Sequence, residues 1–149
     1  MQLRNAVGLV TGGSSGIGRA IAQALAQSGA RVAITGRGQQ RLNETARALG
    51  VFPIQADVAN ESDVERVYRE VLREFGDLDI LVNNAGMGIF KNLVDFDRAS
   101  FQAVFDTNVT GAMLMAREAA KHFIARKRGN IVNIASTAAL RSAWHSILR

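Results

Sequence analysis

Short apolar runs alternate with longer amphipathic runs along the chain, and this alternation limits the fold more than any other feature. The apolar runs predict strands over residues 6–11, 31–35, 51–55, 79–86 and 130–136, the fourth of which ends in a turn. The amphipathic runs predict helices over residues 16–30, 39–50, 61–76 and 97–129, the last with a kink near Gly111. Continuous apolar strands that alternate with helices are typical of a parallel sheet covered on both faces. The sequence therefore predicts one doubly wound α/β domain over residues 1–149.

A glycine-rich turn, TGGSSGIGRA, joins the first predicted strand to the first predicted helix, with glycines at 12, 13, 16 and 18. Glycine allows a tight turn and a close backbone approach, and the amides and dipole of a helix N-terminus attract anions. The phosphate-loop motif is excluded because Arg19 and Ala20 stand where it needs Lys and then Ser or Thr, and the spacing also departs from G-x-G-x-x-G. The turn predicts a nucleotide phosphate site of another type.

From this turn onward the chain resembles the short-chain dehydrogenase/reductase family. TGGSSGIG is similar to its T-G-x-x-x-G-x-G cofactor turn, and ADV (56–58), NNAG (83–86), TNVTG (107–111) and IVNIAS (131–136) follow in the family order. The resemblance implies a Rossmann-like sheet of about five strands in the order 3-2-1-4-5, incomplete at its C-terminal edge. It implies dinucleotide contacts from Gly12, Ser14, Ser15, Gly16, Ile17, Gly18, Asp57, Val58, Asn83, Ala85 and Gly86.

The end of the second strand bears on which dinucleotide binds. NAD enzymes usually place an acidic residue there to bond the ribose 2′-hydroxyl, but this chain has Gly36 followed by Arg37. A guanidinium pairs with a 2′-phosphate, so the sequence predicts NADP(H) in preference to NAD(H). The alternative is that Arg37 is a solvated loop charge, and Arg41 could be a second phosphate contact or a surface residue. Asp57 could cap a helix, but Asn60 is the better cap and leaves Asp57 for the adenine.

The resemblance also implies the catalytic groups, which in the family are Ser, Tyr, Lys and Asn. Asn108 and Ser136 match two of them. The only tyrosine, Tyr68, is followed four residues later by Leu72 rather than Lys, and no Tyr or Lys follows Ser136.

By the family spacing the tyrosine is due near Arg149, so we expect the segment 141–149 to be an interruption rather than an ending. His145 is a poor replacement for the tyrosine because nothing near it replaces the Lys. Two readings remain: an NADP(H)-dependent oxidoreductase acting on a carbonyl or secondary alcohol, inactive as this chain alone, or a non-catalytic NADP(H)-binding half-domain.

Composition excludes several other classes. The net charge of +5 comes from dispersed basic residues, with one cluster at 126–128 that suits a helix C-terminus, so we predict no nucleic-acid partner. The absence of cysteine and the two dispersed histidines argue against a metal site. No apolar run reaches membrane length, and the N-terminus predicts a strand rather than a signal peptide, which favours a cytoplasmic protein. We expect self-association through the long helix (98–128) or the exposed fifth strand.

Overall fold

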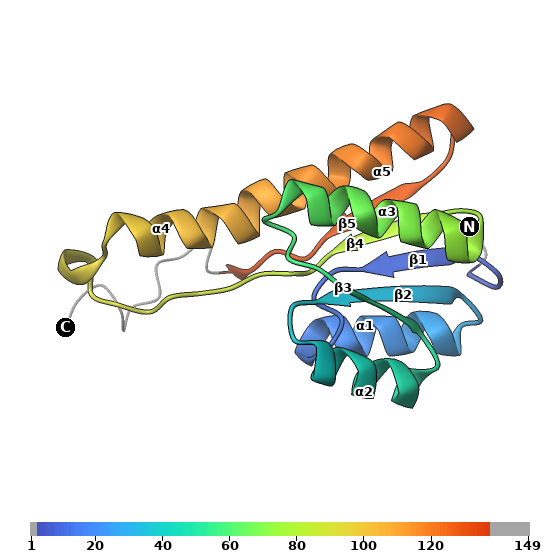
Figure 1. Ribbon diagram of the computed structural model, residues 1–149, viewed down its shortest axis with the longest axis horizontal. Coiled ribbons are helices and arrows are strands. Elements are labelled where there is room, and N and C mark those ends of the chain that lie inside the picture. Colours follow the sequence, from blue (N-terminus) through green and yellow to red (C-terminus); the bar gives the residue numbers. More distant parts are fainter. Residues whose placement is uncertain (1–2, 138–149) are drawn as a thin grey trace.

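Five parallel strands form one sheet in the order β3-β2-β1-β4-β5, as predicted (Figure 1). A computed structural model describes residues 3–137 of the chain. The strands are β1 (Val7–Val10), β2 (Arg31–Gly36), β3 (Phe52–Gln55), β4 (Ile80–Asn83) and β5 (Asn130–Asn133). Between β1 and β4 the order reverses, which in open α/β sheets creates a crevice at the carboxyl ends of the strands.

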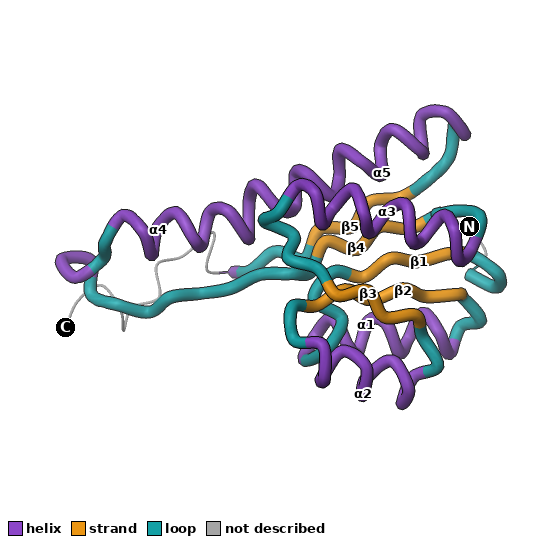
Figure 2. The backbone as a smooth tube through the Cα atoms, viewed as in Figure 1, coloured by secondary structure: helices purple, strands orange, loops and turns teal. Residues whose placement is uncertain are grey.

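Helices cover both faces of this sheet (Figure 2). The helical elements are α1 (Gly16–Gln27), α2 (Gln39–Leu49), α3 (Glu61–Phe75), η1 (Leu93–Asp95), α4 (Arg98–Phe105), η2 (Asp106–Gly111) and α5 (Ala112–Arg126). Helices α1 and α2 contact β1, β2 and β3 on one face, and α3 and α5 contact each other and the sheet on the other. The predicted doubly wound arrangement is therefore confirmed.

The strands bury both of their faces because their side chains alternate between two cores. In β1, Leu9 belongs to the core beneath α3 and α5, whereas Val10 belongs to the core beneath α1 and α2. In β4, Leu81 faces the first core, and Ile80 and Val82 face the second. This double burial explains why the strands read as continuous apolar runs.

Local signals set the helix ends. The Asn60 side chain accepts hydrogen bonds from the amides of Ser62 and Asp63, at 3.0 and 3.2 Å, which confirms it as the cap of α3. Helix α3 ends at Gly76, which has a left-handed backbone with a φ of 76°.

The long helix expected over 97–129 contains an interruption. Residues Asp106–Gly111 form a π-helical segment, so the irregularity expected near Gly111 is a π turn that joins α4 to α5. A Cβ atom on Gly111 would lie 2.7 Å from Cγ2 of Val58, which means that only glycine permits this close contact. Helix α4, all of which is described, buries none of its residues and extends beyond the sheet in Figure 1.

The edge strand β5 differs from its neighbour. All four residues of β4 are buried, whereas all four residues of β5 are exposed among the described residues. Ile131, the register partner of Leu81, is 38% exposed. The open fifth strand expected from the sequence is thus present in residues 3–137. None of the helices in this part of the chain is long and apolar enough to span a bilayer.

Candidate functional site

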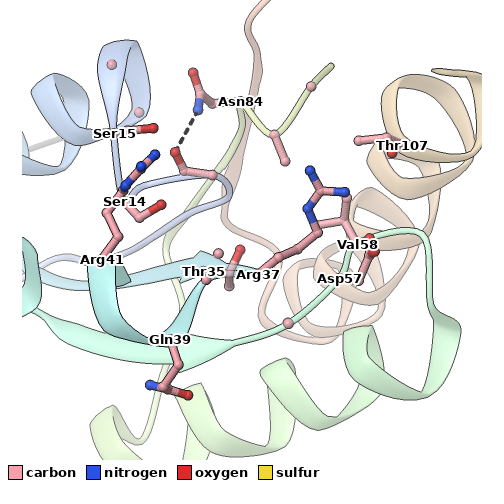
Figure 3. A pocket seen from close by; sticks show the side chains of 18 of the residues that line it. Ser14, Ser15, Thr35, Arg37, Gln39, Arg41, Asp57, Val58, Asn84 and Thr107 are labelled. Atoms are coloured by element: carbon pink, nitrogen blue, oxygen red, sulfur yellow. Dashed lines mark hydrogen bonds between the residues drawn. The ribbon is translucent and has the colours of Figure 1, made fainter. Parts of the chain in front are cut away.

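A cavity of about 1110 Å³ opens at the carboxyl ends of β1, β2, β3 and β4 (Figure 3). It is lined by the glycine turn after β1, the β2–α2 loop and first turns of α2, the loop after β3, the loop after β4, and Thr107 of η2. These segments are far apart in sequence and meet at the crevice where the strand order reverses. Among the predicted contact residues the cavity is lined by Gly12, Ser14, Ser15, Gly16, Ile17, Gly18, Arg37, Asp57, Val58, Ala85 and Gly86.

The glycine turn is shaped so that side chains cannot replace its glycines. Gly12 and Gly16 have φ values of 64° and 53°, which disfavour other residues. A Cβ atom on Gly18 would lie 2.3 Å from Nδ2 of Asn84 and 2.4 Å from the carbonyl oxygen of Gly12. The first turn of α1 carries no acidic residue, and the Ser15 side chain makes no capping hydrogen bond among the described residues. The amides at the start of α1 therefore suit an anionic group.

Thr11 and Asn84 fix the turn to the loop after β4. The hydroxyl of Thr11 accepts hydrogen bonds from the amides of Asn84 and Ala85, both at 2.9 Å. The Asn84 side chain donates to the carbonyl oxygens of Thr11 and Gly12, at 2.9 and 3.3 Å. This cross-link sets the distance between two walls of the cavity. Both residues belong to motifs singled out from the sequence, Thr11 to TGGSSGIG and Asn84 to NNAG, but this cross-link between them was not predicted.

Asn83, a predicted dinucleotide contact, does not line the cavity, whereas its neighbour Asn84 does. The buried side chain of Asn83 donates to the carbonyl oxygen of Ala112 at 3.1 Å and to Oδ1 of Asn133 at 3.0 Å. Within the described residues its Oδ1 atom is buried without a hydrogen-bond partner. Alternation along β4 explains the orientation, because Asn83 shares a face with Leu81 and so points toward α5.

Two guanidinium groups give the β2–α2 side of the cavity positive charge. In Figure 3 the Arg37 side chain points toward Asp57 and Val58, and Arg41 lies on the side of Ser14. The carboxylate of Glu44 also lines the cavity and accepts a hydrogen bond from Gln40 at 3.0 Å.

Gly36 leaves little room for a larger residue beside these charges. A Cβ atom added there would lie 3.0 Å from Oγ of Ser14, tighter than an ordinary contact. A carboxylate at this position would crowd the glycine turn as well as place negative charge in the cavity.

Asp57 lies in the cavity wall and also has a structural bond. Its Oδ1 atom accepts a hydrogen bond from the amide of Ala59 at 3.0 Å, and its own amide donates to Oδ2 of Asp63 at 2.9 Å. Asp57 therefore stabilises the turn before α3. Although Asn60 is the cap of α3, as predicted, one carboxylate oxygen of Asp57 is still engaged in a bond within the protein. The hydrogen bond from the Asp57 amide, together with Arg66, lowers the pKa of Asp63.

The two predicted catalytic residues lie outside the cavity lining. Asn108, in the π turn, accepts a hydrogen bond from the amide of Met87 at 2.8 Å and donates to its carbonyl oxygen at 2.9 Å. This pair of bonds joins η2 to the segment directly after Gly86. Ser136 is exposed and follows the carboxyl end of β5, and the cavity also lies at the carboxyl ends of the strands. The segment 141–149, with His145, lies outside the described residues.

Tyr68 is remote from this chemistry. Its buried hydroxyl donates to the carbonyl oxygen of Met115 at 2.5 Å, between α3 and α5. Burial, and then the nearby charge of Glu118, raise the pKa of Tyr68 far above its usual value. The only tyrosine of the chain is therefore a packing residue, and it does not line the cavity.

The basic cluster at 126–128 has acidic partners at the opposite end of the sheet. Arg126 pairs with Asp77, and Arg128 pairs with Asp79 at 3.0 Å. His122 contacts Asp77 at 2.8 Å. Burial alone would raise the pKa of Asp77, but the hydrogen bonds from His122 and the amide of Leu78, with the charge of Arg126, bring the pKa below its usual value. These cations hold α5 to β4, in addition to their position at a helix end. No group of three or more potential metal ligands occurs among residues 3–137.

Comparison with known proteins agrees with this geometry. The chain is 34% identical over 137 residues to an uncharacterized oxidoreductase of Staphylococcus epidermidis, covering 91% of this chain and 60% of that protein. It is 38% identical over 144 residues to a sorbitol dehydrogenase of Cereibacter sphaeroides, covering 95% of this chain and 56% of that protein. The crystal structure of a short chain dehydrogenase from Bacillus anthracis superposes with a TM-score of 0.91 at 30% identity, covering 95% of this chain and 61% of that one.

The chain thus spans 56 to 61% of the length of these relatives. A family model described as short chain dehydrogenase matches residues 6–147, which is nearly the whole sequence. The chain belongs to the short-chain dehydrogenase family.

Proposed function

We propose that this chain is the cofactor-binding part of a cytoplasmic, NADP(H)-dependent oxidoreductase that transfers hydride between a nicotinamide and a small carbonyl compound or secondary alcohol. Family membership supports the reaction type, and the cavity at the strand ends supports dinucleotide binding. The observation that carries the cofactor preference is Arg37 in the cavity wall, directly after Gly36. The dinucleotide, when bound, supplies or accepts the hydride.

The residues around the cavity divide the binding among themselves. The amides of the glycine turn and of the first turn of α1 suit the pyrophosphate. Asp57 and Val58 suit the adenine, and the wall formed by Asn84, Ala85 and Gly86 leaves space for a ribose. The cross-link between Asn84 and the glycine turn holds these subsites at a fixed separation before the ligand arrives. Pre-formed spacing of this kind reduces the entropic cost of binding.

The charges near β2 favour a 2′-phosphate. Arg37 and Arg41 bring two cations to this end of the cavity, against the carboxylates of Glu44 and Asp57. Glu44 is on α2 with a hydrogen bond from Gln40, and Asp57 uses one oxygen in its own turn. We expect both guanidinium groups to bond the 2′-phosphate, and such charge-assisted hydrogen bonds are strong.

Catalysis needs a proton donor and groups that hold the substrate oxygen. In the proposed enzyme Ser136 orients that oxygen, and Asn108 belongs to the proton relay. Among the 149 residues of this chain, no Tyr or Lys follows Ser136 to complete the family pattern, so we propose that this chain alone binds NADP(H) without turnover.

The cofactor preference is tested by titrating NADPH and NADH with fluorescence detection. We expect tighter NADPH binding, and Arg37→Asp should weaken it by about tenfold or more while improving NADH binding, because a carboxylate repels the phosphate and accepts from the 2′-hydroxyl. Arg69→Asp, on the exposed face of α3, is the matched charge control. Equal binding of the two cofactors by the parent chain would contradict the proposal.

The absence of turnover has its own assay. Purified chain mixed with NADPH and a panel of ketones and aldehydes should show no oxidation above the rate without protein. Measurable turnover that disappears in Ser136→Ala would overturn the non-catalytic reading and would leave the family assignment unchanged.

We also propose that copies of the chain associate through the long helix. Phe101, Phe105, Val109 and Met113 are spaced four residues apart and are between 44% and 54% exposed. Phe101 and Phe105 stack at 4.4 Å between ring centroids, which makes a preformed apolar surface. Phe105→Glu should shift the sedimentation profile toward monomer. If Val132→Lys does so instead, association occurs through the β5 edge.

A further inference from the structure

The loop that carries Arg37 is held by a residue outside the cavity. Gln55, the last residue of β3, donates a hydrogen bond from Nε2 to the carbonyl oxygen of Arg37 at 2.9 Å. The sheet register pairs Gln55 with Gly36, the last residue of β2, so Gln55 lies close to Arg37, which follows directly. Arg37 and Gly38 form the β2–α2 loop, and among the described residues no other side chain is seen to donate a hydrogen bond to their backbone. Gln55 does not line the cavity.

Other restraints on this loop come from the backbone at its two ends. Gly38 is the N-cap residue of α2, and its carbonyl oxygen accepts a hydrogen bond from the amide of Leu42 at 3.0 Å. A Cβ atom added to Gly38 would meet no described atom within 4 Å. The backbone bond from the amide of Ala56 to the carbonyl oxygen of Gly36, at 3.1 Å, precedes Arg37 in the chain. The bond from Gln55 therefore restrains the Arg37 backbone directly, at the base of the side chain that carries the guanidinium.

Gln55 is itself held by an ion-paired arginine on α3. Nη2 of Arg66 donates to the carbonyl oxygen of Gln55 at 2.7 Å. Arg66 is oriented by Asp63 at 2.8 Å and by Glu70 at 3.0 Å. Exposed ion pairs contribute little to stability on their own, but an arginine fixed at both sides is a rigid support for its third partner.

The same ion pair also supports the neighbouring part of the cavity wall, which is formed by the loop after β3. Oδ2 of Asp63 accepts a hydrogen bond from the amide of Asp57 at 2.9 Å, while Oδ1 of Asp63 pairs with Arg66. One pair on α3 therefore sets the backbone at the adenine side directly and the backbone of Arg37 through Gln55. The separation between Asp57 and Arg37 follows from this network.

We infer that Gln55 is a positioning residue for cofactor choice: through its bond to the Arg37 backbone, and supported by the Asp63–Arg66 pair, it sets the guanidinium for a 2′-phosphate on the adenosine ribose. The inference rests on the proposed use of NADP(H). It assigns selectivity for the phosphorylated ribose to a side chain that does not touch the ligand.

The probes are adenosine 2′,5′-bisphosphate and adenosine 5′-monophosphate, which differ only in the 2′-phosphate, and their binding is measured by calorimetry. Gln55→Met keeps the length of the side chain and removes the donor. We expect it to weaken bisphosphate binding by about threefold to tenfold, because the released Arg37 must then be ordered when the ligand binds, with monophosphate binding unchanged. Gln102→Met on α4 removes a similar exposed hydrogen bond, to Asp106, and should change neither affinity.

A double-mutant cycle separates positioning from general support of the fold. If Gln55 acts through Arg37, Gln55→Met should have no further effect on the 2′-phosphate preference in an Arg37→Ala background. Loss of affinity for both probes alike, or an effect that adds to that of Arg37→Ala, would overturn the role of Gln55. If Arg37→Ala removes the preference for the 2′-phosphate but Gln55→Met does not change it, the role of Gln55 is also overturned, while the proposed function is still supported. A parent chain without preference would overturn both.

Discussion

The cavity side of the sheet and its β5 side are covered to different degrees. Strands β1 and β4 are fully buried, and helices α1, α2 and α3 each bury residues against the sheet. Within the described residues, β5 is exposed along its length and α4 buries nothing. The cavity is built on the well-covered side, whereas Asn108 and Ser136 belong to the exposed side. The segments that we propose for nucleotide binding and for catalysis therefore differ in how well they are packed.

The largest expected effect compares two register partners on neighbouring strands. Leu81→Ala, in β4, should lower the free energy of unfolding by about 2–5 kcal/mol, because Leu81 is fully buried. Ile131→Ala, in β5, should cost less than about 1 kcal/mol because its side chain is already partly in water. Urea unfolding measures both. Equal losses would mean that β5 is covered in solution, and the contrast would disappear.

A second prediction concerns the close approach at Gly18. Gly18→Ala places a methyl group against Asn84 and the Gly12 carbonyl, so we expect NADPH affinity to fall by about tenfold or more. Gly8→Ala, in β1, is the control, since its methyl group would lie 3.4 Å from Leu25. Fluorescence titration gives the affinities and a thermal melt the stabilities. Unchanged binding in Gly18→Ala would show that the turn adapts and that the cavity is less rigid than its glycines indicate.

The smallest expected effect lies in the ion cluster that joins α5 to β4. Because the pKa of Asp77 is lower in the folded protein than in an unfolded chain, its stabilising effect is complete above the unfolded pKa of about 3.9 and is lost as the pH falls through the folded pKa. Asp77→Asn should cost about 1 kcal/mol at neutral pH and flatten the loss of stability on acidification. Urea unfolding between pH 7 and acid measures the slope, with Asp95→Asn on η1 as the control. An unchanged slope would show that other carboxylates control acid unfolding.

Much of the fold could be predicted because its signals are local. The apolar runs, the cap at Asn60 and the glycine after α3 each act over a few residues, and the structure has the corresponding strands and helix ends. The π turn was anticipated only as a kink near Gly111. Gly111, its last residue, lies against Val58 of a distant loop, and no local pattern identifies that partner.

The site was predicted less completely, as three cases show. Asn83 and Asn84 differ in direction rather than in chemistry, and the alternation from Leu81 was the signal that could have separated them. In the sequence, Thr11 gives no sign of its long-range contact. In the structure, its hydroxyl accepts hydrogen bonds from two amides of the loop after β4. The bond from Gln55 to Arg37 depends on the pairing of β2 with β3, which no motif encodes.

The cross-link between Thr11 and Asn84 has a consequence for the order of folding. The two residues are 73 positions apart, so the glycine turn cannot reach its final shape by local folding. Closing the long loop between them costs conformational entropy, so we expect this contact to form late in folding. During synthesis β1, the turn and α1 leave the ribosome well before β4. The glycine turn is therefore among the first segments to be made and, we expect, among the last to reach its final shape.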